Sequence, residues 1–347
     1  MHSLAQYRES LYQKPELREL FLELTLRCNE NCFHCGSRCG DVRSEELSLQ
    51  QYEELLNEVR REFPDRLPRI CITGGEPMLR RDFEAIVRMI HEMGFRWGMT
   101  SNGTLIDEKA ARMLREVGMG TISISIDGLR ETHDRYRRTP GAYDRAMRGI
   151  EALIREGGFH AVQVTTVIHK GNIEELDAMF EVMDGIDIDS WRVIGMEPIG
   201  RARDFPHLLP DASDQRRILE FIRSKRELGY PVQYGCSHYL GLDFEREVRD
   251  WYFLCNAGIY VGSVMANGDI GACLDIERRP ETIMGNIKTD SFTDVWKNRF
   301  EIFRRDPALD NADCMKCESR EFCAGGSRHS WDYDGNRQMV CMKGVLF

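Results

Sequence analysis

The sequence has no apolar run that approaches the roughly 18 residues of a membrane-spanning helix, so we expect no membrane partner. Basic residues are in deficit, because 47 Lys and Arg against 57 Asp and Glu leave a formal net charge of −10. This balance argues against nucleic acid as a primary partner. The first residues also lack the apolar segment of a secretory signal, so we predict a cytoplasmic protein.

Cysteine, in contrast, is plentiful, with 12 residues in a chain of 347. A reducing compartment disfavours disulfides, and a chain of this length does not need them to fold, so metal binding is the better explanation. One group lies near the front of the chain and a second group lies in the last hundred residues, which predicts two metal regions: Cys28, Cys32, Cys35 and Cys39, then Cys255, Cys273, Cys314, Cys317, Cys323 and Cys341.

Short apolar runs alternate with amphipathic stretches over the first two thirds of the chain. The expected strands are Leu20–Leu26, Arg69–Thr73, Trp97–Ser101, Thr121–Ile126, Val162–Ile168 and Ser190–Ile194. The expected helices are Ser48–Phe63, Phe83–Met93, Asp107–Val117, Tyr143–Gly157, Asn172–Met183 and Asp214–Leu228. Strict alternation indicates parallel pairing with right-handed crossovers, and six strands are too few for a closed eight-stranded barrel. The sequence therefore predicts an α/β fold, a partial (β/α)6 TIM-like barrel.

The alternation ends after Gly200, where Gly, Asn, Asp and Cys become frequent. We therefore expect a smaller second domain that is held by metal rather than by a large apolar core. The predicted division is an N-terminal extension (1–19), the partial barrel (20–212), a bridging helical region (213–250) and a cysteine-rich domain (251–347).

The strongest motif follows the first strand, where Cys28, Cys32 and Cys35 have the spacing C-x3-C-x2-C. Three thiolates can hold a [4Fe-4S] cluster and leave one iron open to another ligand. A zinc loop completed by Cys39 or His34 remains the alternative, although structural zinc usually has C-x2-C pairs.

A second motif, Gly74-Gly75-Glu76-Pro77, follows the second strand. Paired glycines allow a ligand to approach the backbone, Pro77 restricts the turn, and Glu76 offers a carboxylate to an ammonium group. Both motifs begin at the carboxyl ends of strands, where active sites of α/β barrels collect.

With these two motifs, with Ser101-Asn102-Gly103 and with Ser125-Ile126-Asp127-Gly128, the sequence resembles the radical S-adenosylmethionine (SAM) superfamily. The resemblance implies that Cys28, Cys32 and Cys35 hold a [4Fe-4S] cluster whose open iron is chelated by SAM. It places Gly75 and its neighbours at the methionine ammonium, Ser125 and Arg137 at the ribose and carboxylate, and His34 and Met196 near the adenine. His34 stands where the family often has Tyr or Phe. The full predicted SAM site is His34, Gly74, Gly75, Glu76, Pro77, Ser101, Asn102, Ser125, Asp127, Arg137 and Met196.

The C-terminal cysteines resemble a SPASM domain, a module that carries auxiliary iron–sulfur clusters. The resemblance implies a distal [4Fe-4S] cluster held by Cys314, Cys317, Cys323 and Cys341. A zinc ribbon is the alternative, because C-x2-C is shared by both metals.

The nearer auxiliary site departs from the family pattern, because Ser327 stands where the family has a cysteine and only Cys255 and Cys273 remain. Four alternatives are open: the site recruits Cys236, holds a smaller or open-iron cluster, uses a non-cysteine ligand, or is empty. A single auxiliary cluster on Cys255, Cys273, Cys314 and Cys317 is a further alternative.

The resemblance implies an enzyme that cleaves SAM reductively and abstracts a hydrogen atom from a substrate. The expected substrate is a ribosomally made peptide or a protein, which would be cross-linked or epimerised. A flavodoxin or ferredoxin is the expected reductant. Because about twenty residues precede the first strand, we expect a leader to be bound by a separate partner protein or by the rim of the barrel. Cys71 and Cys236 are candidate hydrogen-atom donors, although Cys71 also suits a buried strand position.

Three other functions remain open. Formylglycine formation in sulfatases would require an aspartate directly after Cys273, where this chain has Leu274 and then Asp275. Tailoring of haem or of a quinone cofactor is the second alternative. An iron–sulfur electron carrier or a zinc-stabilised binding module is the third, and it would not need the turn at Gly74–Pro77.

Overall fold

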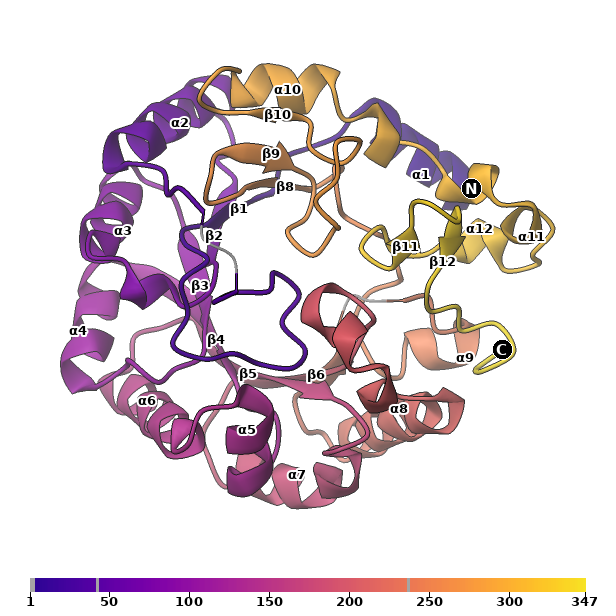
Figure 1. Ribbon diagram of the computed structural model, residues 1–347, viewed down its shortest axis with the longest axis horizontal. Helices are drawn as coiled ribbons and strands as arrows, with labels where there is room; N and C mark the ends of the chain where they lie inside the picture. Colours follow the sequence, from indigo (N-terminus) through magenta and orange to yellow (C-terminus); the bar gives the residue numbers. More distant parts are fainter. Residues whose placement is uncertain (1–3, 42–43, 236–237) are drawn as a thin grey trace.

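The computed structural model describes residues 4–41, 44–235 and 238–347. Within these residues ten strands form one sheet in the order β10-β9-β8-β1-β2-β3-β4-β5-β6-β7. Strands β8 and β1 to β7 pair in parallel, whereas β9 and β10 are antiparallel. Figure 1 shows the strands curving into an open ring with the crossover helices on its outer side. The fold is the expected α/β partial barrel.

The six predicted strands are all present. Their bounds are β1 (Glu19–Glu23), β2 (Arg69–Thr73), β3 (Trp97–Ser101), β4 (Met119–Ser125), β5 (Ala161–Ile168) and β6 (Ser190–Gly195). Strand β1 ends three residues earlier than predicted, and the chain then turns into the cysteine loop.

The crossover helices are α2 (Leu49–Glu62), α3 (Phe83–Glu92), α4 (Glu108–Glu116), α6 (Ala142–Glu156), α7 (Leu176–Asp184) and α8 (Ala212–Glu227). Ser48 caps α2 in a capping box with Gln51, and Asp107 caps α4 by accepting from the N–H of Ala110. Each of these helices turns a row of apolar residues toward the sheet, which accounts for the predicted spacing.

Alternate residues of the strands face the two sides of the sheet. The fully buried residues, such as Leu20 and Leu22 of β1 and Val164 of β5, pack with the helices. The other set forms the inner face of the ring, where Cys71, Thr165 and their neighbours are less buried. The inner face is the side toward which the loops at the carboxyl ends of the strands project.

Several elements were not predicted. They are α1 (Leu4–Gln13), α5 (Arg130–Arg137), β7 (Val232–Tyr234), α9 (Leu242–Glu245), β8 (Val261–Val264), β9 (Asp269–Gly271), β10 (Gly285–Asn286), α10 (Phe292–Asn298), α11 (Ala312–Met315), α12 (Arg320–Cys323), β11 (Trp331–Asp332) and β12 (Arg337–Gln338), with 3-10 turns at Pro77–Leu79, Ile173–Glu175, Gly200–Asp204, Pro206–Leu208, Glu301–Phe303 and Pro307–Asp310.

The expectation that the C-terminal third lacks a large apolar core is wrong for its first half. Strand β8 pairs with β1, and Phe292, Trp296 and Phe300 are buried in the same hydrophobic core as the barrel. Helix α10 also docks on α2, where Glu58 accepts hydrogen bonds from Thr293. The predicted domain boundaries therefore cross a continuous core, and the division itself stays a prediction. None of the described helices is long and apolar enough to cross a membrane.

Candidate active site

The three cysteines of the first motif lie on the loop that follows β1. Cys32 is buried and Cys28 and Cys35 are half-buried, and no disulfide joins the described cysteines. Burial raises the pKa of the Cys28 thiol to about 11. Hydrogen bonding from Cys39 lowers the pKa of Cys35 to about 6, and the Cys39 backbone N–H lies 3.2 Å from the Cys35 sulfur. Three soft sulfur ligands on one loop fit an iron–sulfur cluster.

The loop is held from two sides by residues far along the chain. The N–H groups of Asn31 and Phe33 donate to the carbonyls of Arg137 and Tyr136, at the free carboxyl end of α5. On the other side the buried guanidinium of Arg201 donates to the carbonyls of Cys32 and Cys39 at 2.6 and 2.7 Å. These contacts restrict the cysteine loop before any cofactor binds.

The turn after β2 packs directly against the same loop. The N–H of Gly75 donates to the carbonyl of Thr25, and a Cβ added at Gly75 would lie 2.1 Å from the carbonyl oxygen of Arg27. Gly74 has φ +151°, and its Cβ would lie 2.4 Å from the Thr25 oxygen. The glycines are therefore required by the close approach of the protein's own backbone, and the predicted approach of a ligand to them stays a prediction.

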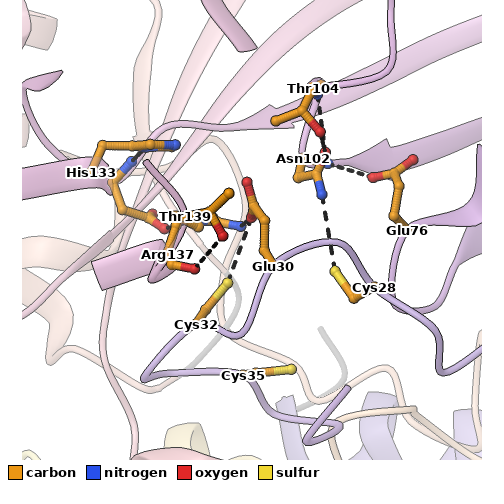
Figure 2. Close-up of polar contacts among 12 residues, drawn as sticks. Cys28, Glu30, Cys32, Cys35, Glu76, Asn102, Thr104, His133, Arg137 and Thr139 are labelled. Carbon is orange, nitrogen blue, oxygen red and sulfur yellow. Dashed lines mark hydrogen bonds and ion pairs between the residues drawn. The ribbon is translucent and has the colours of Figure 1, made fainter. Parts of the chain in front are cut away.

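The Glu76 carboxylate is paired within the protein, and its predicted contact with a ligand ammonium group stays a prediction. It is fully buried and accepts hydrogen bonds from the Ser101 hydroxyl at 3.0 Å and from the Asn102 N–H at 2.9 Å. Burial raises its pKa to about 7, against these hydrogen bonds, which lower it. Asn102 in turn donates to Asn29 and lies 4.0 Å from the Cys28 sulfur, as Figure 2 shows for Glu76, Asn102 and Cys28. Glu76 thus ties the turns after β2 and β3 to the cysteine loop.

Asp127 and Arg137 also face each other rather than an open surface. The Arg137 Nε donates to Asp127 Oδ2 at 2.7 Å, and His34 Nε2 lies 3.2 Å from the same oxygen. Burial would raise the pKa of Asp127, but the guanidinium of Arg137 and the neighbouring His34 hold it well below its usual value. The predicted contact of Arg137 with the SAM carboxylate would require this pairing to open.

Two further predicted SAM residues occupy different surroundings. Ser125 is half-buried on the inner face at the end of β4, opposite Thr165 of β5. Met196 follows β6 and is buried in a small apolar cluster with Tyr136, next to Phe33 of the cysteine loop. Ser125 is therefore placed where a ligand could reach it, whereas Met196 acts as part of the support of the loop. Pro77 is buried and begins a 3-10 turn.

The four cysteines assigned to the distal auxiliary cluster lie together. Burial and the neighbouring thiols of Cys341, Cys314 and Cys317 raise the pKa of Cys323 to about 12. The N–H of Cys317 donates to the carbonyl of Cys314, and Arg8 of α1 donates to the carbonyls of Glu321 and Phe322 beside Cys323. Four thiols in one region suit the ligand set of a [4Fe-4S] cluster, although no group of three or more His, Cys, Asp or Glu side chains among the described residues is placed to hold a metal ion.

The nearer site contains two thiols and a hydroxyl. Cys255 and Cys273 both lie near Tyr333, whose phenol pKa is raised chiefly by burial and further by these thiols. The N–H of Arg328 lies 3.4 Å from the Cys255 sulfur, so Ser327 adjoins this thiol. The Ser327 hydroxyl is buried and has no hydrogen-bond partner. This donor set does not fit a four-thiolate cluster. Cys236 lies outside the described residues.

A buried ionic cluster was missed by the sequence analysis. Glu197 follows Met196, and its Oε1 lies 3.3 Å from His238 Nε2 and 3.2 Å from His329 Nε2. The Ser330 hydroxyl donates to the other carboxylate oxygen. His329 and Ser330 lie 132 and 133 positions from Glu197 in the sequence, and His238 is also distant, so no local motif could reveal the cluster. The cluster joins the end of β6 to the segment that carries Ser327.

Cys71 lies on the inner face of β2, where burial raises the pKa of its thiol to about 12. Its position is compatible with the proposed role as a hydrogen-atom donor, which stays a proposal.

The structure is an open parallel barrel with three cysteine thiols on the loop that follows β1. This architecture suits an enzyme that holds an iron–sulfur cluster at the carboxyl end of its barrel. The chain belongs to the radical SAM superfamily, whose sequence pattern matches residues 22–183. The SPASM pattern, an iron-sulfur cluster-binding domain, matches residues 255–318. The chain is therefore a radical SAM enzyme, and its cofactors are SAM, a [4Fe-4S] cluster and auxiliary iron–sulfur clusters.

Relatives with named activities cover most of the chain. The AdoMet-dependent heme synthase of Methanosarcina barkeri is 31% identical over 87% of this chain and 89% of its own length. The mycofactocin maturase MftC of Mycolicibacterium smegmatis is 31% identical over 88% of this chain and 76% of its own length. The structure of Streptococcus suis SuiB bound to precursor peptide SuiA is 18% identical with a TM-score of 0.71, over 93% of this chain and 74% of that chain. This last likeness shows the shared fold.

Proposed function

We propose that this enzyme modifies a peptide or protein by abstracting a hydrogen atom from one of its residues. Bound SAM supplies the chemistry, because its reductive cleavage yields a 5′-deoxyadenosyl radical. The protein's part is to hold the substrate C–H bond against that radical and to exclude water and oxygen. Cys28, Cys32 and Cys35 are the proposed ligands of the catalytic cluster, and Ser125 is a proposed SAM contact.

The observation that carries the peptide proposal is the polar inner face of the barrel. Ser123 and Thr165 hydrogen bond across β4 and β5 at 2.6 Å, and Arg192 of β6 donates to Thr165. Gln163 and Ser190 form a further pair at 2.9 Å. Hydroxyl and amide groups in this number suit the amide groups of a peptide backbone. An extended aromatic macrocycle would instead need mostly apolar and aromatic walls.

Modification of a haem-type tetrapyrrole is the second candidate. It is favoured by the name of the Methanosarcina barkeri relative, which this chain matches over 89% of that relative's length. MftC, which is named a maturase, is equally similar in sequence, and SuiB shares the fold and binds a precursor peptide.

We also propose a flavodoxin or ferredoxin as the electron donor, a separate leader-binding protein as a partner, and a cytoplasmic location.

Transfer of deuterium to 5′-deoxyadenosine distinguishes the two substrate classes. Short peptides encoded beside the gene would be prepared with deuterated residues and incubated anaerobically with reconstituted enzyme, SAM and dithionite. We expect deuterated 5′-deoxyadenosine and a peptide product of altered mass. An iron coproporphyrin deuterated on its propionate side chains serves as the matched second substrate. Deuterium transfer from the porphyrin and not from any peptide would overturn the peptide proposal.

A further inference from the structure

The guanidinium of Arg137 is the centre of a buried ionic group behind the cysteine loop. Its side chain is 8% exposed and lies between Asp127 and Glu30, both of which have side chains that are 0% exposed. Nη2 lies 2.5 Å from Asp127 Oδ2, and Nη1 lies 3.0 Å from Glu30 Oε2. A buried guanidinium with two carboxylates leaves one negative charge to be balanced by other groups.

The same Glu30 oxygen connects this group to the cysteine loop. Glu30 Oε2 lies 3.7 Å from the Cys32 sulfur, and Glu30 Oε1 has no hydrogen-bond partner. Figure 2 shows the Cys32 sulfur and the Arg137 side chain both approaching the Glu30 carboxylate. A thiol can donate to Glu30, but a thiolate that ligates iron has no proton to donate. In the loaded enzyme a carboxylate therefore faces an anionic ligand in a buried setting.

Two buried anions repel each other strongly, because little water is present to screen their charges. The pair of Glu30 and the Cys32 thiolate is therefore unfavourable unless a cation lies nearby. Among the described residues, Arg137 is the cation that contacts Glu30. The charge near a cluster and the hydrogen bonds around its sulfur ligands set its reduction potential. Arg137 and Glu30 must then act on the potential in opposite directions.

The backbone gives Arg137 a fixed position for this role. Its carbonyl accepts from the N–H of Asn31 and from the Thr139 hydroxyl, and it ends α5, where Arg138 adopts φ +54°. Asp127 is itself fixed by the N–H of Val167 at 2.8 Å. The guanidinium is thus held between Asp127 and Glu30, while its backbone is fixed at the end of α5.

We propose that Arg137 is a positioning residue of the catalytic cluster, whose charge offsets that of Glu30 beside the ligating Cys32 thiolate and so raises the reduction potential, rather than a ligand of the SAM carboxylate. The proposal rests on the proposed ligation by Cys32. It goes beyond the identity of the substrate, because it concerns the transfer of an electron to the catalytic cluster. That step is the same whether the substrate is a peptide or a tetrapyrrole.

The test is an EPR-monitored redox titration of the reconstituted enzyme without SAM. The spectrum of the variant with Cys28, Cys32 and Cys35 changed to Ala is subtracted, so that the catalytic cluster alone is followed. We expect Glu30→Gln to make reduction at least about tenfold more favourable, which is 59 mV for one electron. Arg137→Gln should lower the potential by a similar amount, and Arg137→Lys should remain close to wild type.

Two controls separate an effect on the cluster from a general effect of losing a buried charge and from an effect on SAM binding. Arg249→Gln alters another fully buried Arg–Glu pair, that with Glu245, and should leave the potential unchanged. Calorimetric SAM affinity of Glu30→Gln should stay within about threefold of wild type. If Arg137→Gln does not fold, Glu30→Gln decides alone. An unchanged potential in Glu30→Gln, a shift in the same direction in both variants, or weaker SAM binding by Arg137→Gln without a shift in potential would overturn the proposal.

Discussion

The backbone N–H of Asn102 donates to the buried carboxylate of Glu76 over 2.9 Å, which joins the turns after β2 and β3. Because Asn102 also approaches the Cys28 sulfur, a change at Glu76 should reach the cysteine loop. The carboxylate is therefore a structural centre of the site, although it lies in a motif that sequence reasoning assigns to a ligand.

Glu76→Gln tests this role. An amide has one acceptor oxygen: if it takes the place of Oε2, which accepts from both Ser101 and Asn102, the amide NH2 group must face the Met78 N–H that donates to Oε1. We expect a loss of about 1–3 kcal/mol in the free energy of unfolding, together with weaker SAM binding. Chemical denaturation of the apoprotein and calorimetry of the reconstituted enzyme measure the two effects. Wild-type stability with lower SAM affinity would show that Glu76 contacts the ligand after all.

Gly75→Ala should disturb the fold of the cysteine loop and not only SAM binding. The added Cβ would lie 2.1 Å from the Arg27 carbonyl oxygen, so the backbone of the loop must move. We expect reduced iron content after reconstitution and a lower thermal midpoint. Gly185→Ala is the matched control, because Gly185 has φ −76° at the end of α7 and a Cβ there meets atoms no closer than 3.4 Å. Normal iron content in Gly75→Ala would contradict the packing argument.

Iron analysis tests the nearer auxiliary site. Two complete clusters predict about eight irons per chain, against about twelve for three clusters. Ser327→Cys should add iron if the missing thiolate is the reason for the deficit. Ser327→Ala should leave both iron content and stability unchanged, because the hydroxyl has no partner to lose. A loss of iron in Ser327→Ala would identify the hydroxyl as a ligand and reject the incomplete-site account.

The pH dependence of stability should respond to His133. Burial and the nearby Arg137 lower its pKa from 6.5 to about 4, so the folded protein keeps the ring neutral while the unfolded chain is protonated. The free energy of unfolding should therefore fall as pH decreases below about 6.5, by up to ~1.4 kcal/mol per pH unit from this group. His133→Gln should lose less stability than wild type between neutral pH and about pH 5. Parallel losses in the two proteins would contradict the assigned pKa shift.

Much of the barrel could be predicted because its strands and amphipathic helices carry their burial pattern locally. The bounds of β2 and β3 agree with the prediction, and Ser48 and Asp107 are the caps that their positions indicated. Helix α5 was missed because its sequence is almost wholly polar and its burial comes from contacts with the distant cysteine loop. Strands β8 to β10 are only two to four residues long, and they become part of the sheet because β8 pairs with β1, β9 with β8 and β10 with β9.

For the site, the position of the motifs could be predicted from the sequence, whereas the contacts of its charged residues could not. The cysteine loop and the Gly74–Pro77 turn were correctly placed beside each other at the carboxyl ends of β1 and β2. The pairing of Glu76 and Arg137 with other protein groups could not be predicted, because a motif shows which charged groups are present and not which of them pair. Burial decides that question, and here it pairs Glu76 with Asn102 and Arg137 with Asp127.

Anaerobic SAM cleavage by cysteine variants tests the central claim most directly. The claim is that the loop after β1 supplies the catalytic cluster through Cys28, Cys32 and Cys35. The variant with these three residues changed to Ala should form no 5′-deoxyadenosine with SAM and dithionite, while it retains auxiliary iron. Cys39→Ala, which alters a buried thiol of the same loop, should cleave SAM. Undiminished cleavage by the triple variant would contradict the account.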